Sequence, residues 1–309
     1  MIRYIVKRVL MVIPVLISVT FIIFSLIYFS PADPARVILG EQATGEAIEQ
    51  LREERGWNDP FLTQYFRYAR NVFLEQDLGR SYVTNRPVYN EIIARYPNTI
   101  KLAVSAVLVA ILVGIPLGVI SAIKQYSIID NISMFFALIG VSMPIFWQGI
   151  LLILLFSLTL GWLPSAGYST WQHMILPAFT LGTGSAAIIA RMTRSSMLEV
   201  YRQDYVRTAR AKGLKEFYVV NRHALRNALI PVVTVVGLQF GFLLGGAVLT
   251  EAIYSITGVG GMIVNAIRMR DMMIVQGGVL LIAVTFTIIN LVVDIVYGFL
   301  DPKVRGQYK

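Results

Sequence analysis

Long runs of uncharged, mostly apolar residues divide this chain into candidate membrane spans. Four stretches without a charged residue, each 22 to 24 residues long, occupy 9–32, 102–123, 227–250 and 272–293. About 20 apolar residues in a helix cross the roughly 30 Å hydrocarbon core of a bilayer, and an ionised group at its centre costs at least about 3 kcal/mol. Each stretch is therefore predicted to be a transmembrane helix, the first covering about 9–30 with a bend at Pro14.

A longer stretch, between Asp130 and Arg191, has room for two spans. The turn sequence Gly-Trp-Leu-Pro-Ser-Ala-Gly lies in its middle, at 161–167. Aromatic residues of the kind enriched at membrane surfaces flank this turn: Trp162, Tyr168 and Trp171. The pattern predicts spans at about 133–159 and 173–192, and so an all-α membrane protein with six transmembrane helices.

Composition agrees with a membrane protein and narrows the possible chemistry. Apolar side chains make up 56% of the 309 residues and charged ones 15%, against about 25% charged in soluble domains. The chain has no cysteine, which excludes disulfides, thiolate metal sites and a catalytic cysteine. The net charge of +9 is not gathered on one soluble face, so we expect no nucleic-acid partner.

The positions of Lys and Arg predict the orientation. Segment 191–226 carries nine basic and three acidic residues, and further basic residues precede the first span and follow the last. Cytoplasmic segments show such an excess, so both termini are expected inside. The expected organisation is an N-terminal tail with the first span (1–30), an extracytoplasmic helical segment (31–98), a core of five spans (99–300) with a cytoplasmic loop (194–230), and a cytoplasmic tail (301–309).

The outer segment is expected to hold two helices. One covers 46–55 and ends at Gly56, and a second runs to about Glu75 with Asp59 as N-cap and Pro60 as its first residue. The apolar residues of the second helix either pack on the protein and membrane surface or form a docking surface for an extracellular partner. They are Phe61, Leu62, Tyr65, Phe66, Ala69 and Phe73.

Two features inside the spans bear on packing and on a pathway. Small residues, which let membrane helices approach closely, recur at every fourth position in the second and fifth spans. They are Ala106, Ala110, Gly114, Gly118 and Ala122, then Gly237, Gly241 and Gly245. Polar groups in spans are candidates for function: we expect Gln239 and Asn290 to line a pathway, and Asp294 to pair with a basic tail residue.

The basic loop is predicted to form two protruding helices. Ser196 and Glu199 have the spacing of a capping box, and Gly213 suits the left-handed position after a helix. A second short helix follows, before Pro231 opens the fifth span. Its apolar residues are expected on one side: Leu214, Phe217, Val220 and Leu225. Composition alone also fits lipid binding, capture by a calmodulin-like protein, or charge that only sets topology.

The sequence of this loop is similar to the coupling loop of bacterial ABC importer permeases, and most to the dipeptide and oligopeptide branch. The similar stretches are Asp-Tyr-Val-Arg at 204–207, Thr-Ala-Arg-Ala-Lys-Gly at 208–213, and 222–231. The general family pattern (Glu-Ala-Ala, three residues, Gly, nine residues, Ile-x-Leu-Pro) is only partly met. Other similar stretches lie at 78–81, 99–102, 251–254, 258–260, 270–271, 293–297 and 300–303. The family usually has proline before Gly258, where this chain has Thr257.

This resemblance implies a type I ABC importer permease fold and a set of partners. They are a second homologous permease chain, one or two ATP-binding subunits, an extracytoplasmic solute-binding protein and the lipids of a bacterial or archaeal plasma (inner) membrane. The chain has no Gly-x-x-x-x-Gly-Lys-Ser/Thr loop, the sequence that cradles phosphates. It is therefore expected to be no enzyme and to bind no cofactor itself, with ATP and Mg²⁺ on the ATPase subunits.

The resemblance also assigns site residues. Coupling to the ATPase is expected of Asp204, Arg207, Ala209, Arg210, Gly213, Leu214, Phe217, Arg222 and His223. Glu251, Gly258 and Gly260 are expected to shape an outer turn or gate. No catalytic residue and no metal site are expected, since neither His173 nor His223 has companion ligands.

The substrate stays open at this stage. Dipeptides or oligopeptides fit the resemblance, and so do glutathione, nickel chelates or another small solute, because those permeases share the motifs. An ATP-independent secondary transporter is the remaining alternative. It is disfavoured because only Asp294 is ionisable within a span and no internal repeat is visible.

Overall fold

The computed structural model describes residues 2–31, 33–40 and 42–300, and these residues form helices without a β-strand. The helices, with η marking wider π-helical turns, are α1 Ile2–Tyr28, α2 Pro34–Leu39, α3 Gly45–Arg55, α4 Phe61–Arg70, η1 Asn71–Glu75, α5 Val88–Ile123, α6 Ile128–Ser142, α7 Ile145–Leu152, η2 Ile153–Thr159, α8 Gln172–Tyr201, α9 Asp204–Ala211, α10 Glu216–Tyr218, η3 Val219–Leu225, α11 Arg226–Ile253, α12 Val259–Arg268 and α13 Met272–Leu300. The tail predicted at 301–309 lies outside the described residues.

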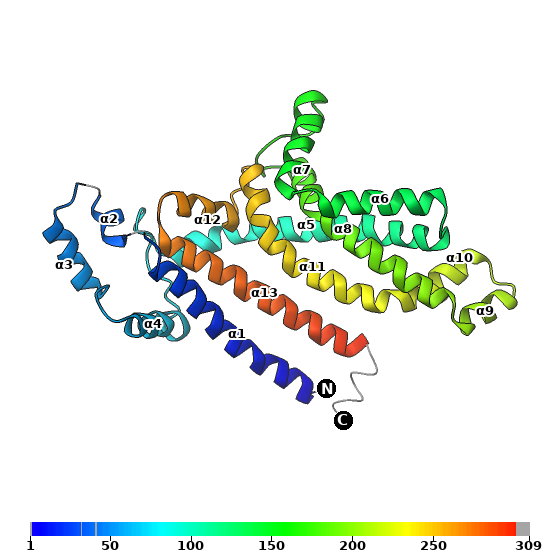
Figure 1. Cartoon of the computed structure of the whole chain (residues 1–309), viewed down its shortest axis with the longest axis horizontal. Helices are drawn as coiled ribbons and strands as arrows, with labels where there is room; N and C mark the ends of the chain where they lie inside the picture. Colours follow the sequence, from blue (N-terminus) through cyan, green and yellow to red (C-terminus); the bar gives the residue numbers. More distant parts are fainter. Residues whose placement is uncertain (1, 32, 41, 301–309) are drawn as a thin grey trace.

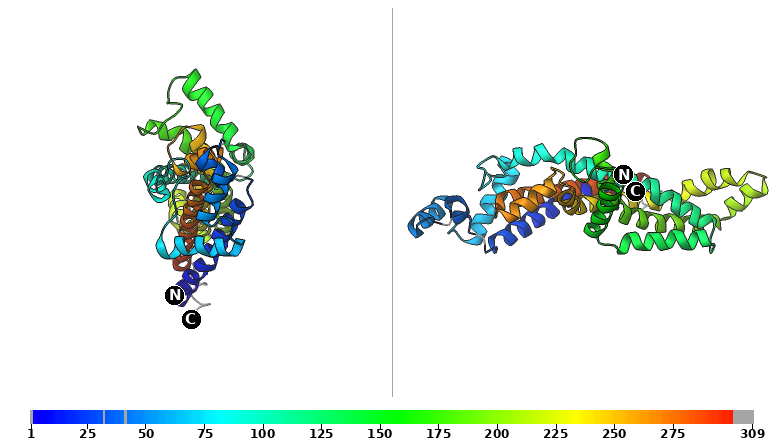
Figure 2. Two further views of the ribbon diagram at one scale, coloured as in Figure 1. Left: turned by 90° about the vertical axis from the view of Figure 1, so that its left-hand side faces the viewer. Right: turned by 90° about the horizontal axis from the view of Figure 1, so that it is seen from above.

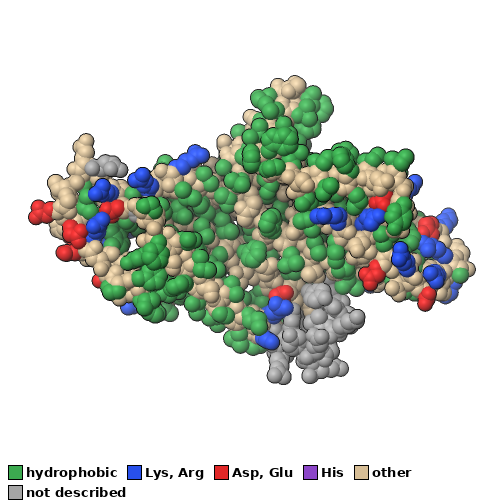
Figure 3. Space-filling model, in the orientation of Figure 1, with side chains coloured by type: hydrophobic (Ala, Val, Ile, Leu, Met, Phe, Trp, Pro, Cys, Tyr) green, Lys and Arg blue, Asp and Glu red, His purple; other side chains and the backbone are tan. Residues whose placement is uncertain are grey.

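The long helices lie side by side along the longest axis of the molecule (Figure 1). The outer segment with α2, α3 and α4 extends from one end of this bundle and α9 with α10 from the other, both in Figure 1 and in the right-hand view of Figure 2. We call these ends the α12 end and the α9 end. Charged side chains gather at the two ends, and hydrophobic ones cover much of the surface between them (Figure 3). Such a band is what a bilayer requires of a spanning protein.

Among the residues that the structure describes, five helices are long and apolar enough to cross a membrane, and a bent pair makes a sixth if it counts as one span. The span predicted at 133–159 corresponds to this bent pair and is not a single helix, because the chain bends by 109° between α6 and α7. Met143 is extended there (φ −79°, ψ 126°), as a residue before proline tends to be. Pro144 then starts a new helix, and α7 with η2 projects from the side of the bundle (Figure 1).

The most extensive helix contact among the described residues joins α5 and α8, and small residues make it possible. The predicted row on α5 is buried throughout, which confirms its role in packing. A Cβ added to Gly114 or Gly118 would lie 2.6 or 2.5 Å from a backbone oxygen of α8. The row on α11 is only partly used: Gly237 and Gly241 face α13, whereas no described heavy atom lies within 4 Å of a Cβ on Gly245.

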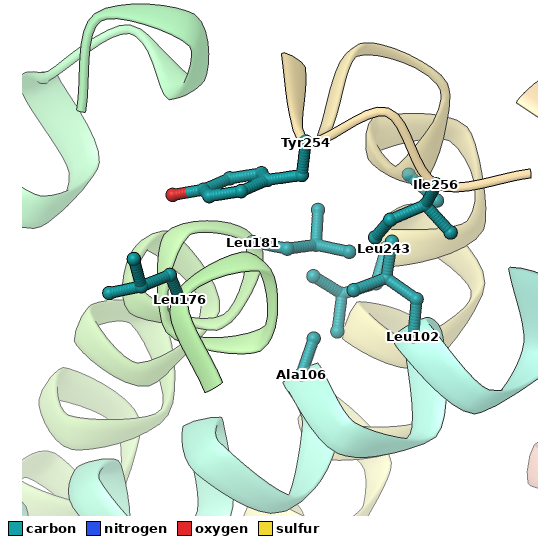
Figure 4. Packing of buried hydrophobic residues seen from close by; sticks show 8 residues of the cluster. Leu102, Ala106, Leu176, Leu181, Leu243, Tyr254 and Ile256 are labelled. Carbon is teal, nitrogen blue, oxygen red and sulfur yellow. The ribbon is translucent and has the colours of Figure 1, made fainter. Parts of the chain in front are cut away.

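The main hydrophobic core joins α5, α8, α11 and the turn after α11. Figure 4 shows Leu102 and Ala106 of α5, Leu181 of α8 and Leu243 of α11 packed together, with Tyr254 above them. The Tyr254 hydroxyl is 2.8 Å from the hydroxyl oxygen of Thr180, so this aromatic ring is buried with its polar group satisfied. The core therefore fixes the α12 end of three long helices against one another.

The outer segment packs on α1 through aromatic side chains. Phe61 and Tyr65 of α4 lie against Phe21 and Phe24 of α1, with ring centroids 5.2 to 5.7 Å apart. This confirms packing on the protein for part of the predicted apolar side. Ala69 is half-buried, and the other three residues remain exposed: Leu62, Phe66 and Phe73.

Both helices predicted in the outer segment are present, but the N-cap predicted for the second one is wrong. Gly56 ends α3 in the left-handed conformation (φ 64°), as predicted. The second helix runs from Phe61 to Glu75, its last five residues widened into η1. Asp59 does not cap it; its carboxylate accepts instead from the Arg67 guanidinium, a charged partner that outcompetes a backbone N–H.

Asp271, just before α13, ties a loop of the outer segment to the bundle. Its carboxylate accepts from the Ser81 hydroxyl and, at 3.1 Å, from the Tyr82 N–H. The Ser81 oxygen accepts in turn from the N–H groups of Val83 and Thr84. The Asp271 residue is only 3% exposed. One buried carboxylate thus joins two segments 190 residues apart.

Gly118→Ala should destabilise the bundle. The added methyl group meets a backbone oxygen of α8 that cannot rotate away, and overpacking of this kind costs about 1–3 kcal/mol. We expect the melting temperature of the detergent-solubilised chain to fall by about 2–10 °C. Gly245→Ala is the matched control and should leave it unchanged or raise it, because alanine favours helix. Equal melting temperatures for both variants would contradict the close contact.

Asp271→Ala should release the loop at 80–87. Hydrogen bonds to a charged group contribute about 1.5–3 kcal/mol, so hydrogen exchange at the Tyr82 amide should accelerate about 10- to 150-fold. Asp77→Ala is the control, because the Asp77 carboxylate accepts a local bond, from Gly79 N–H at 2.8 Å. Unchanged exchange at Tyr82 in Asp271→Ala would show that the loop is held by other contacts.

Candidate functional site

Residues 204–226, which the resemblance assigns to coupling and which we call the coupling segment, are held together by a buried apolar cluster at the α9 end. Val206 and Ala209 of α9 pack against Val219 of η3, with Val200 of α8 beside them. The Asn227 amide of α11 donates to the Tyr205 hydroxyl at 2.9 Å. The two arms of the segment, α9 on one side and α10 with η3 on the other, are therefore packed together. They also contact α8 and α11, the long helices on either side of the segment.

The start of the segment differs from the prediction. α8 continues through Ser196, which is buried inside the helix, so the capping box predicted there is wrong. The chain breaks at Arg202 and Gln203, and α9 starts at Asp204. The end of α9 follows the prediction, since Gly213 has φ 76°, a left-handed conformation that suits glycine.

Arg210 joins the two arms from inside the segment. Its guanidinium donates to both carboxylate oxygens of Glu216, at 3.1 and 2.8 Å, and lies over the Tyr201 ring at 4.6 Å from the centroid. The Tyr201 hydroxyl donates to the same carboxylate at 2.8 Å. The hydrogen bonds to Glu216 raise the pKa of Arg210 above its ordinary value. This residue therefore holds the shape of the segment.

The tip of the segment exposes apolar and charged side chains together. Phe217 is 72% exposed, Leu214 is also exposed, and Val220 is buried. The predicted single apolar side is therefore wrong: the π-helical turn that begins at Val219 turns Val220 inward while Phe217 points out. The structure places the nine predicted coupling residues as follows: Asp204, Arg207, Gly213, Leu214, Phe217 and Arg222 exposed, Arg210 and His223 half-buried, and Ala209 buried.

The other face of η3 sits on the long helices. Val220 and Ala224 contact Ala122 of α5 and Met197 of α8 in one buried cluster that also holds Ala228 of α11. We call this cluster the seat of the segment. η3 continues into α11 at Arg226, with Pro231 inside the helix, so the prediction that Pro231 opens the span is wrong. The segment is thus packed directly against α5 and α8 and is continuous with α11.

The two predicted pathway residues lie on different helix pairs. The Gln239 amide donates to Ser185 Oγ of α8 at 3.0 Å. The buried Asn290 Oδ1 has no hydrogen-bond partner among the described residues and faces Gly241 of α11. The structure therefore does not bring them together. Asp294 pairs with Arg8 at 2.7 Å, a basic residue of the N-terminal region, as predicted.

The predicted outer-turn residues do come together, around the start of α12. Glu251 is fully buried, and its carboxylate accepts from the Thr99 hydroxyl at 2.6 Å and from Gly261 N–H at 2.9 Å. The Thr99 oxygen accepts in turn from Val259 N–H at 2.9 Å. The carboxylate thus satisfies, directly and through Thr99, N–H groups that a helix start leaves free. A Cβ on Gly258 would lie 2.2 Å from this carboxylate, so only glycine fits.

A cavity of about 540 Å³ opens beside this turn, between the outer segment and α12. Acidic and basic side chains both line it, including Glu91, Arg95, Arg268 and Asp271. It therefore presents both signs of charge at the α12 end. No group of three His, Asp or Glu residues able to hold a metal ion occurs in the described part of the chain.

Two pairs of interacting residues were missed from the sequence. Thr99 was recognised only as part of a family stretch, although a hydroxyl at the start of one span suits a buried acid at the end of another. Asp130 enters the prediction only as the limit of an uncharged stretch, and Arg194 only as one of the nine basic residues of 191–226, yet the two form an ion pair at the α9 end, with the Asp130 carboxylate buried and Arg194 half-buried. Opposite charges at neighbouring span ends on one side of the membrane are the signal for it.

Family models cover almost the whole chain. Residues 114–306 match the binding-protein-dependent transport system inner membrane component, and residues 1–103 match the N-terminal part of such membrane components. Full-length relatives agree. The dipeptide transport system permease protein DppB of Alkalihalophilus pseudofirmus is 46% identical over 99% of this chain and all of its own length. The glutathione transport system permease protein GsiC of Escherichia coli K12 is 43% identical over 99% of both chains.

Solved structures show the same fold. Two crystal forms of the methionine ABC transporter MetNI in inward-facing conformations match with TM-scores of 0.56 and 0.59 at 18% identity. Each match covers 68% of this chain and at least 95% of the other. The fold is therefore that of a type I ABC importer permease, as predicted. The chain belongs to the family of binding-protein-dependent transport system inner membrane components and is a multi-pass permease of the inner membrane.

Proposed function

We propose that this chain is the transmembrane permease subunit of an ATP-driven importer of dipeptides or oligopeptides. The relatives named above support a small peptide as substrate, because one is named for dipeptides and another for glutathione, itself a short peptide. Glutathione is therefore the second candidate. Permease subunits of this family are not enzymes themselves, and the family works with ATPase and substrate-binding proteins.

The coupling segment is the proposed docking site for an ATPase subunit. The observation that carries this proposal is that the segment exposes an apolar tip while its other face packs against three long helices. Phe217 and Leu214 face out, whereas Val220 and Ala224 lie in the buried seat. An exposed aromatic residue within charged surroundings is typical of an interface anchor. Movement of such a tip is passed to the helices because protein interiors are close-packed.

The orientation follows from charge. The α9 end carries the basic loop and is placed in the cytoplasm, where the ATPases with their ATP and Mg²⁺ lie. The ion pair between Arg8 and Asp294 holds the first turns of α1 near the end of α13, which supports both termini on one side. The α12 end, with the outer segment and the Glu251 turn, then faces a solute-binding protein outside.

The proposed mechanism is alternating access between two permease chains. A second homologous chain completes the pathway, and one or two ATPase subunits close on ATP binding. Closure displaces the coupling segment, and its seat transmits the displacement to α5, α8 and α11. Lipid or the second chain covers the apolar surfaces of α1, α6, α7 and α13, which are largely exposed in this chain.

Phe217→Ala should weaken docking of the ATPase subunits without unfolding the chain. Burial of a phenylalanine contributes about 1.5–3 kcal/mol, so the affinity for the ATPase should fall roughly 10- to 150-fold. The measurement is recovery of ATPase subunits with the tagged permease, together with peptide uptake. Phe66→Ala is the matched control, since Phe66 is 65% exposed on the outer segment. Recovery equal to wild type for Phe217→Ala would contradict the docking site.

Gly213→Pro should uncouple ATP hydrolysis from import. Proline fixes φ near −65°, whereas this position has φ 76° and its N–H donates to Arg210 C=O at 2.9 Å. The tip is then misplaced while the spans stay intact. We expect stimulated ATPase and uptake to fall at least about tenfold.

Gly40→Pro is the control for this change. Gly40 also has a left-handed φ (87°) and donates to Arg36 C=O at 2.9 Å, but it lies in the outer segment. Its stimulated ATPase activity should match wild type. Equal uptake by Gly213→Pro and wild type would refute the role of the segment.

A further inference from the structure

An ion pair between a buried aspartate and a half-buried arginine joins α6 to α8 at the α9 end. Arg194 of α8 donates to Asp130 of α6 through two nitrogens, Nε to Oδ1 at 2.8 Å and Nη2 to Oδ2 at 2.7 Å. The Asp130 side chain is only 3% exposed. A bidentate pair of this kind fixes direction as well as distance, because the planar guanidinium matches the carboxylate.

The same carboxylate collects two further segments. The Ser121 hydroxyl, near the end of α5, donates to Asp130 Oδ1. The Tyr126 N–H, in the turn between α5 and α6, donates to Oδ2 at 2.9 Å, and Tyr126 itself holds a left-handed φ of 63°. One acidic side chain therefore orders the end of α5, the turn, the start of α6 and α8.

This cluster lies next to the seat of the coupling segment. Ala122, which contacts η3, follows Ser121 directly, and Met197, also in the seat, is one helical turn beyond Arg194. The seat is thus formed by the same two helix ends that the ion pair connects to α6.

α6 depends on this connection more than α5 does. α5 is already fixed to α8 by close backbone contact at Gly114 and Gly118. α6 buries only Asp130, Ser133 and Ala137, one face of the helix. A Cβ on Gly140, near the other end of α6, would still be 3.4 Å from the nearest atom of α8.

We propose that Asp130 and Arg194 are positioning residues that make α5, α6 and α8 one rigid support for the coupling segment. A displacement of the segment then moves α6, and through it α7 and η2, together with α8. This inference rests on the proposed function. Without the pair, α6 stays behind and the movement driven by ATP is lost before it reaches α7.

The first test compares ATP hydrolysed with peptide imported by the whole reconstituted transporter. Asp130→Asn and Arg194→Gln should keep ATPase activity within about twofold of wild type while import falls at least about tenfold. Asp294→Asn is the matched control, because it breaks the ion pair with Arg8, which lies away from the seat. Its ratio of ATP to peptide should stay within about twofold of wild type. A wild-type ratio in the Asp130 and Arg194 variants overturns the inference.

A second test replaces the ion pair with a covalent bridge. The chain has no cysteine of its own, so Asp130→Cys with Arg194→Cys can be bridged by a short bis-maleimide, and no unpaired charge is left buried. Unbridged, this double variant should be uncoupled; bridged, it should regain import to within about threefold of wild type. Normal import without the bridge, or no recovery with it, overturns the inference.

The outcomes separate the two proposals. If the wild-type transporter itself shows no ATP-dependent peptide import, the proposed function fails and the inference fails with it. If the wild type and Asp294→Asn are coupled and the Asp130 and Arg194 variants are coupled too, only the inference fails. The yield of bridged product reports directly whether α6 and α8 still meet in the double variant, which excludes misfolding as the explanation.

Discussion

Close contact between the backbones of α5 and α8 is the constraint on which the rest of the structure depends. Lipid is as apolar as a leucine side chain, so membrane helices gain little from hiding apolar surface and must gain from fit. Gly114 and Gly118 provide that fit on α5, and Gly182 provides it on α8. The main core, the seat of the coupling segment and the attachment of α6 are all built on this pair of helices.

Buried acidic residues place the remaining segments on this frame. Glu251 fixes the start of α12, Asp271 fixes the loop of the outer segment, and Asp130 fixes the turn between α5 and α6. Each carboxylate receives donors from segments remote in the sequence, and an ionised group is tolerated in such surroundings only when its partners are in place. Each acid therefore specifies one arrangement of the chain ends around it, which apolar packing alone would leave loosely defined.

The sequence predicts features that depend on one stretch of chain and misses those that depend on two. The spans follow from the exclusion of charge, and Gly213 follows from the end of a helical pattern. Pro144 stands at the break between α6 and α7, but a proline alone does not predict a break, because Pro14 and Pro116 lie inside continuous helices.

The errors at the candidate site have the same origin. The capping box at Ser196 is a valid local signal, but burial of Ser196 and Met197 keeps α8 helical. The pairing of Asp130 with Arg194 requires knowledge that α6 lies on α8.

Gly118 and Gly213 show that two glycines of one chain can restrict divergence among relatives for different physical reasons. At Gly118 selection acts on volume, so any larger residue is excluded. At Gly213 space is open among the described residues and selection acts on backbone handedness. Asparagine and aspartate, which tolerate a left-handed backbone, are therefore acceptable replacements there, whereas β-branched residues are not.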